Sequence, residues 1–254
     1  MQLRSQLNSQ LFSSAGGKLK ALAGLGFAVG IVSAGGQAGA AVYPTPNLLT
    51  NQGFETNALT PFSNVIGSPY STNIWGDEAS TITTATAGVT PFAGTQMLSM
   101  TTDFNTYTQT IQLVDLSPYS TDITAGLLNA NFNAKFDAAV NVPAAIAGVI
   151  VQFYDSSHNI VGSTSSASLT LDANTTTWQQ ISLANVPVPT ATKYVGAQVV
   201  YNDASLAVNG QNNQGFVDDA FLSLDKATTP EPSSLMALIP AGAMLLLRRR
   251  RPTA

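Results

Sequence analysis

The chain has 254 residues, no cysteine and a single histidine, His158. These counts exclude thiol catalysis, thiolate metal sites and any site that needs two imidazoles. Between the terminal segments, three lysines (Lys135, Lys193 and Lys226) stand against thirteen acidic residues, so this central region has a net charge of about −10. A region so poor in basic side chains cannot neutralise phosphates, which argues against nucleic acid and anionic lipid surfaces as partners and leaves divalent cations and neutral sugars.

Residues 1–41 have the pattern of a signal peptide. Their three charged side chains are all basic and lie in the first half, and an uncharged run of small and apolar residues follows at 21–34. Ala38 and Ala40 are small residues at the two positions that a signal peptidase reads, and we predict cleavage after Ala40 or Ala41. A single N-terminal membrane anchor is the alternative. Export would place the middle of the chain outside the cytoplasm.

Residues 42–226 are expected to form one all-β domain. No stretch sustains an apolar period of 3.6 residues for three turns. Instead, short segments rich in Thr, Val, Ile and aromatic residues are separated by Gly, Pro, Asn and Asp. Such segments with close-set turns are typical of a two-sheet sandwich and not of βαβ units. The expected strands are 47–54, 72–75, 81–85, 95–100, 107–114, 127–134, 148–154, 178–183, 194–201 and 215–224.

A turn and a low-complexity stretch follow the expected strand 148–154. Residues 155–159 are rich in Asp, Ser and Asn, so we expect a hairpin turn with His158 exposed at its tip. As a base or a metal ligand, His158 would have no partner His or Cys. The Ser/Thr/Ala-rich residues 163–168 and 170–177 are expected to flank a short strand at 169–171.

The expected last strand places one carboxylate on its buried face. Along residues 215–224 the even positions are mostly apolar, and the period of two in a strand then buries Asp218 with them. A buried carboxylate needs a partner, which pairing, metal coordination or backbone hydrogen bonds can supply. If a bulge shifts the row, Asp219 takes this place.

Two segments resemble the jelly-roll carbohydrate-binding modules, which are galactose-binding-like sandwiches. The segment from Asn47 to Glu55 begins with Asn-Leu-Leu, reaches Gly-Phe-Glu and resembles their opening strand. Asp218 and Asp219, followed by alternating apolar residues, resemble their closing strand. The resemblance implies a single two-sheet jelly-roll β-sandwich, a structural calcium ion that joins Glu55 to Asp218, and sugar binding as the associated function.

Sugar-binding sandwiches stack aromatic side chains on sugar rings, and Trp75 and Tyr107 are the candidates for this role. Core packing is the alternative for both. No motif selects a pair of catalytic carboxylates, and Gly-x-Ser-x-Gly is absent, so we expect no enzyme. The leading hypothesis is a non-catalytic protein that holds polysaccharide. The alternatives are a purely structural matrix or adhesion protein without a glycan ligand and a carboxylate-dependent, glycan-active enzyme.

Residues 227–254 have three parts with different physical properties. The prolines of Pro230-Glu231-Pro232 remove two backbone donors and keep the segment extended. The apolar run 235–247 would span about 20 Å as a helix, short of a hydrocarbon core of about 30 Å. The arginines that follow would stop this run from passing through a membrane; they are Arg248, Arg249, Arg250 and Arg251.

This tail resembles the PEP-CTERM sorting signal of Gram-negative bacteria. The resemblance implies recognition by an exosortase-type membrane protease and transient anchoring in the inner membrane through the C-terminal helix. It further implies delivery to the cell surface or the extracellular matrix. The sequence therefore predicts an exported β-sandwich, residues 42–226, between two targeting segments.

Overall fold

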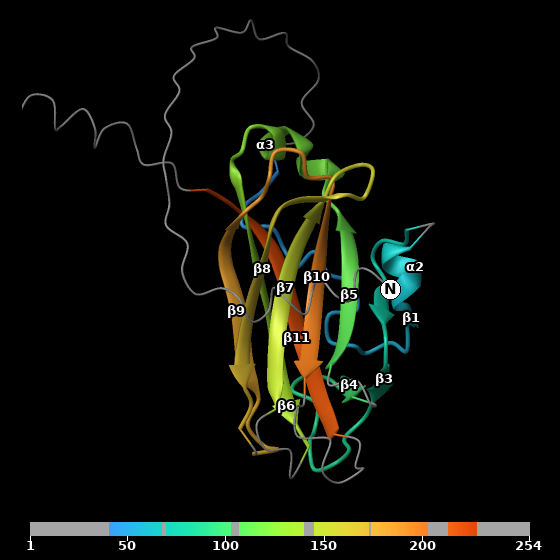
Figure 1. Ribbon diagram of the computed structural model, residues 1–254. Coiled ribbons are helices and arrows are strands. Elements are labelled where there is room, and N and C mark those ends of the chain that lie inside the picture. The colour runs from blue at the N-terminus through green and yellow to red at the C-terminus, as the bar shows by residue number, and fades with distance from the viewer. Residues whose placement is uncertain are drawn as a thin grey trace, which may run out of the picture.

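Two β-sheets packed face to face form the part of the chain that the computed structural model describes, residues 41–67, 70–102, 107–139, 145–172, 174–202 and 213–227 (Figure 1). This confirms the two-sheet β-sandwich predicted from the sequence. The predicted signal peptide and the sorting tail lie outside the described residues, and the domain boundaries stay predictions. Among the described residues, no helix has the length and apolar character needed to cross a membrane.

Among the residues that the structure describes, sheet A has six strands and sheet B has five. In sheet A the spatial order is β1 (Leu59–Pro61), β2 (Trp75–Asp77), β5 (Tyr107–Asp115), β10 (Tyr194–Asn202), β7 (Ile146–Tyr154) and β8 (Ile160–Thr170). In sheet B it is β3 (Ser80–Thr83), β4 (Met97–Thr102), β11 (Asn213–Lys226), β6 (Leu128–Ala138) and β9 (Gln179–Pro187). All pairs are antiparallel except β1 with β2.

The main core lies between the sheets and follows from period-two alternation along the strands. On β6 the even positions, such as Phe132 and Phe136, are buried in this core, whereas Asn131 and Asn133 are half-exposed on the outer face. On β7 the odd positions, such as Val149 and Phe153, face inward. Because the two rows differ in polarity, a one-residue slip would expose the core, and the register is therefore fixed.

Short helices complete the sandwich, and the sequence pattern did not reveal them. The helix α2 (Phe62–Ile66) covers part of the outer face of sheet A, where Val65 packs with Ile111 and Leu113. The 3₁₀ helix η1 (Ser117–Tyr119) and the helix α3 (Ser120–Thr124) connect β5 to β6. All three are too short for a 3.6-residue period to be visible.

The segment expected to be the opening strand is extended but is not a strand. Thr45 and Leu48 donate backbone hydrogen bonds to Leu224 and Leu222 of β11, at 3.0 and 2.8 Å. The segment then leaves β11 in a turn, with positive φ at Asn51 and Phe54. The prediction of a regular strand at 47–54 is therefore wrong, because the turn interrupts the ladder after a few residues.

The strand β8 was also underestimated, since only 169–171 was expected to be extended. It begins at Ile160 and continues through the whole Ser/Thr-rich stretch to Thr170. Most of its side chains are exposed. Because neither row of side chains is buried, the sequence shows no alternation of apolar and polar residues that would have predicted the strand. β8 and β9 lie at the same side of the sandwich (Figure 1).

Candidate functional site

Glu55 and Asp218, the carboxylates predicted to share a cation, bind the same loop, residues 92–96. Glu55 accepts hydrogen bonds from the backbone N–H of Thr95, at 3.0 and 3.1 Å to its two oxygens, and from the Thr95 hydroxyl at 3.0 Å. Asp218 accepts a hydrogen bond from the N–H of Ala93 at 3.0 Å and one from the N–H of Asp219 at 2.7 Å. The two predicted residues are therefore brought to one place.

The backbone at Gly94 permits this arrangement. Gly94 lies between the two bonded parts of the loop and has a φ of +65°. A Cβ atom there would lie 2.0 Å from Oε1 of Glu55, which is far inside contact distance. Only glycine combines the left-handed backbone with room for the carboxylate.

The two carboxyl groups have opposite electrostatic environments. Asp218 is fully buried, and burial raises its pKa to about 6 despite the hydrogen bonds from Ala93 and Asp219. Glu55 is exposed, and the N–H of Thr95 holds its pKa below the ordinary value. A register shift follows Asp218 in the β6–β11 pairing, and Asp218 lies opposite Lys135 on the outer face of sheet B, where loop 92–96 covers it. The burial predicted for Asp218 is confirmed, but the prediction that it shares the core-facing row of Leu222 and Leu224 is wrong.

The oxygen atoms at this place are of the type that binds a hard cation. Carboxylate oxygens and nearby backbone carbonyls are ligands that calcium accepts. Backbone N–H groups already satisfy Asp218, however, so its burial does not depend on a metal. Within the described ranges, no group of three or more His, Cys, Asp or Glu side chains gathers. A calcium ion held by Glu55 and Asp218 would therefore need further ligands from backbone carbonyls or water.

Trp75 does not lie where a ligand could stack on it. Its side chain is 1% exposed and packs on Phe54, with ring centroids 5.2 Å apart. Its indole N–H donates to the backbone oxygens of Thr50 and Asn51, at 3.1 and 3.2 Å. This corrects the assignment of Trp75 to ligand binding, because the ring instead fixes the turn that follows the first segment.

Tyr107, the other predicted ligand-binding residue, belongs to a row of neutral polar side chains on the outer face of sheet A. The Tyr107 hydroxyl and Nε2 of Gln198 both donate to Oε1 of Gln109. These residues come from two neighbouring strands, β5 and β10, and project from the face opposite the core.

The row continues over β7 to β8. The Tyr154 hydroxyl donates to Oε1 of Gln152 at 2.8 Å, and Nε2 of Gln152 donates to the Thr164 hydroxyl at 3.0 Å. Burial raises the pKa of Tyr154 to about 12, so its hydroxyl stays a donor at every physiological pH. Gly196 on β10 lets the ring lie close, because a Cβ there would be 3.1 Å from the ring.

At one end of this face, three aromatic rings are stacked. His158 lies between Tyr70 and Tyr194, with centroid distances of 3.4 and 4.7 Å and interplanar angles of 4° and 11°. The predicted turn is present, since Asp155 accepts hydrogen bonds from the N–H groups of Ser157 and Asn159. His158 is half-buried in the stack, so the prediction of an exposed tip residue is wrong.

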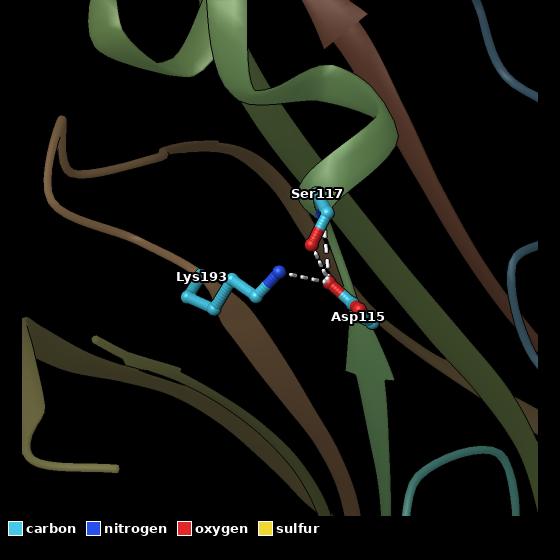
Figure 2. A network of polar contacts seen from close by, with 3 residues as sticks. All are labelled: Asp115, Ser117 and Lys193. Atoms are coloured by element: carbon cyan, nitrogen blue, oxygen red, sulfur yellow. Dashed lines mark hydrogen bonds and ion pairs between the residues drawn. The ribbon is translucent and has the colours of Figure 1, made fainter. Parts of the chain in front are cut away.

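A polar network holds this end of the face in place (Figure 2). Lys193 contacts Asp115 at 3.3 Å, and the N–H and hydroxyl of Ser117 donate to the same carboxylate. Burial opposes ionisation, but these contacts together hold the pKa of Asp115 below its ordinary value. The Lys193 ammonium also lies 5.6 Å from the Tyr194 ring centroid, so the network and the stack are one unit.

Sequence reasoning named Tyr107, whose role in ligand binding stays a prediction, but missed the glutamines beside it and the stacking of the rings. The signal was the alternation of β5, in which Tyr107, Gln109, Ile111 and Leu113 share one face. The sorting-motif residues (Pro230, Glu231 and Pro232) and the arginines 248–251 lie outside the described residues.

The fold and these contacts define a jelly-roll β-sandwich in which a row of neutral polar side chains crosses the outer face of sheet A, beside the apolar patch under α2. No family model and no curated protein matches the chain. Among solved structures it is similar to TmCBM61 in complex with β-1,4-galactotriose, at 18% identity over 70% of this chain and 98% of that one, with a TM-score of 0.47.

Two further structures are similar at the same level. The CBM22-1 xylan-binding domain of Xyn10C from Paenibacillus barcinonensis has 11% identity over 74% of this chain and 100% of that one, with a TM-score of 0.44. The Family 16 Carbohydrate Binding Module-2 has 17% identity over 69% and 99%, with a TM-score of 0.41.

Proposed function

We propose that this chain is an exported, non-catalytic β-sandwich that binds an uncharged polysaccharide across the outer face of sheet A. One observation carries the proposal: the row of phenol, amide and hydroxyl groups that runs from Tyr107 on β5 to Thr164 on β8. Sugars present hydroxyls, which are donors and acceptors at once, and amides offer both functions side by side.

The charge of this face supports a neutral ligand. Among the alternate positions of β5, β10, β7 and β8 that face outward, Asp115 at one end is the only charged residue, and Lys193 neutralises it. An anionic polysaccharide would find no free cation here, and the domain as a whole repels it. A neutral polysaccharide is not subject to this electrostatic repulsion.

Accessibility divides the face into a floor and a rim. Gln109, Gln152 and Gln198 are 5, 8 and 2% exposed, so this buried floor holds the neighbouring phenol and hydroxyl groups in position and does not itself face solvent. Tyr70 is 38% exposed, and Tyr107 is half-exposed, so these rings at the two ends are the first groups that a polymer meets. Aromatic rings suit this position because the apolar faces of sugar rings stack on them.

The test compares the full-length wild-type chain with Tyr70→Ala and Tyr107→Ala in binding to a panel of neutral and anionic polysaccharides. We expect each variant to weaken binding to the neutral ligand by about tenfold, as for a lost stacking contact of about 1 to 1.5 kcal/mol. Phe221→Ala is the matched control, because Phe221 is 38% exposed on sheet B. Equal losses in all three variants would contradict the proposed face.

A purely structural matrix or adhesion role is the alternative, and the same panel distinguishes it. Absence of binding to every polysaccharide would favour this scaffold function. Turnover of any bound glycan would instead favour a carboxylate-dependent enzyme and overturn the non-catalytic assignment.

Two further parts of the proposal rest on the sequence and on the hydrogen bonds that Glu55 and Asp218 accept from loop 92–96. We propose that Glu55 and Asp218 bind a structural calcium ion, supported by their convergence on one loop. We also propose that signal peptidase and an exosortase-type protease process the chain on its way to the surface or matrix of a Gram-negative bacterium, supported by the Pro-Glu-Pro, apolar and arginine segments of the tail.

A further inference from the structure

The strand β8 forms a long edge of sheet A. It has 11 residues, and within the described residues it pairs with β7 alone. The opposite edges are short, since β1 has three residues and β3 has four. Proteins commonly blunt an edge by shortening it or by adding Lys, Pro or a bulge, because unpaired backbone groups invite another strand. β1 and β3 follow this rule, and most of β8 does not.

The pairing with β7 identifies which backbone groups of β8 point away from the sheet. The N–H of Leu171 donates to the carbonyl of Ala145 at 2.8 Å, and the register continues without a shift from Thr170 to Ser165. Hydrogen-bonded pairs alternate along an antiparallel ladder, so Leu169 and Ala167 also bond to β7. The N–H and C=O groups of Ser166, Ser168 and Thr170 therefore point outward.

The side chains on this edge leave the outward groups accessible. Ser166, Ser168 and Thr170 are exposed, small hydroxyl residues, and Leu169 is 39% exposed. The one register shift lies near Gly162, outside the regular part, so it does not bend the edge between 165 and 170.

Charge points to a second copy of this chain as the occupant. Residues 160–170 and 174–192, which include β8 and β9, contain no Asp, Glu, Lys or Arg, although the region 42–226 has a net charge of about −10. Two such acidic molecules repel each other wherever their carboxylates meet. The side formed by β8 and β9 is where they approach without bringing carboxylates together.

We propose that two copies of this chain associate by antiparallel pairing of their β8 strands, centred on Ser168. In this register Ser168 faces Ser168 of the other copy, and Ser166 faces Thr170. Each of these facing pairs exchanges two backbone hydrogen bonds. Leu169 of one copy packs next to Ala167 of the other, which buries the exposed leucine. The two A sheets become one continuous sheet.

The test is sedimentation of the full-length chain over a range of concentrations, in one neutral detergent throughout so that the terminal segments contribute equally in every variant. Ser168→Pro removes an outward N–H without removing a bond to β7, which is where an edge strand tolerates proline. Ser168→Lys places two like charges opposite each other. Thr81→Lys on the short edge strand β3 is the matched control, because Thr81 is also exposed.

We expect a wild-type dimer whose dissociation constant rises about tenfold in Ser168→Pro, as for the loss of two hydrogen bonds, and is unchanged in Thr81→Lys. In Ser168→Lys it should also rise, because the facing charges repel each other. Amide hydrogen exchange adds a readout on the wild-type chain: the amides of Ser166, Ser168 and Thr170 should be protected at high concentration and exchange freely at low concentration. A monomer at every concentration, or a dimer that both Ser168 variants leave intact, overturns the proposal.

Discussion

Replacing Asp137 by Asn should stabilise the protein at neutral pH and leave it unchanged in acid. Asp137 lies on the outer face of sheet B and is 2% exposed. Its Oδ1 accepts a hydrogen bond from the N–H of Ala138 at 2.7 Å, whereas Oδ2 is buried without a partner. Asparagine keeps the accepting oxygen and replaces the unpartnered one by an uncharged amide, so the substitution removes the buried charge with little change of shape.

The expected gain follows from the pKa of this carboxyl. Burial, opposed by the Ala138 hydrogen bond and assisted by the charge of Asp172, raises the pKa of Asp137 from 3.8 to about 6. Between these pH values the folded chain binds more protons than the unfolded chain, so the wild type loses stability as the pH rises through this window. The full loss is about 3 kcal/mol at neutral pH, from 1.36 kcal/mol for each factor of ten in proton affinity.

Urea unfolding followed by tryptophan fluorescence measures this difference. The free energy of unfolding of Asp137→Asn should exceed that of the wild type by up to about 3 kcal/mol at pH 7.5, and the two should converge below pH 4. Asp172→Asn, at an exposed neighbour, should give a much smaller gain and serves as the control for the change in net charge. A difference that is independent of pH, or a destabilised variant at pH 7.5, would refute the argument from a buried, ionised carboxylate.

Three further outcomes test other parts of the structure. Gly94→Ala should lower the free energy of unfolding by at least about 1 kcal/mol in urea titrations, because a Cβ atom is strained at positive φ and collides with Glu55. An unchanged unfolding midpoint would show that Glu55 does not hold loop 92–96 in this conformation. Millimolar calcium should raise the melting temperature, EDTA should lower it, and Glu55→Ala or Asp218→Ala should abolish the difference. Neutral replacements of the arginines 248–251 should impair retention and processing, as measured by fractionation and the size of the mature chain; normal processing would count against the sorting assignment.

Alternation made the layers of the sandwich predictable. On β11 the even row predicted to face the core does so only after the register shift, at Leu222 and Leu224. Before the shift Asp218 pairs with Lys135 on the outer face, so loop 92–96 buries it and the alternation does not. Where only one face of a strand is buried, the polarity of each residue indicates which face its side chain lies on. Where a strand is exposed, as β8 is, selection for apolar residues is absent and the Ser/Thr composition is that of a loop.

The candidate site was less predictable because it depends on packing between distant segments. The sequence left both a core role and a binding role open for Trp75, and its burial against Phe54 decides for the core. Likewise, no local sequence pattern predicts the stack of Tyr70, His158 and Tyr194, because the three rings belong to separate segments of the chain. Pairings of this kind are set by the whole topology, which the local sequence does not encode.

The position of β11 in sheet B has a mechanical consequence under the proposed anchoring of the chain by its C-terminal tail. It is flanked by β4 on one part of its length and by the segment 45–48 on the next, with β6 along its other side. Asn47 adds two side-chain bonds, to the carbonyl of Ala220 and the N–H of Leu222. A pull on the tail therefore acts along β11, in shear across many hydrogen bonds at once, and cannot peel them apart one by one. The last strand before the tail is thus hydrogen-bonded to neighbours on both sides.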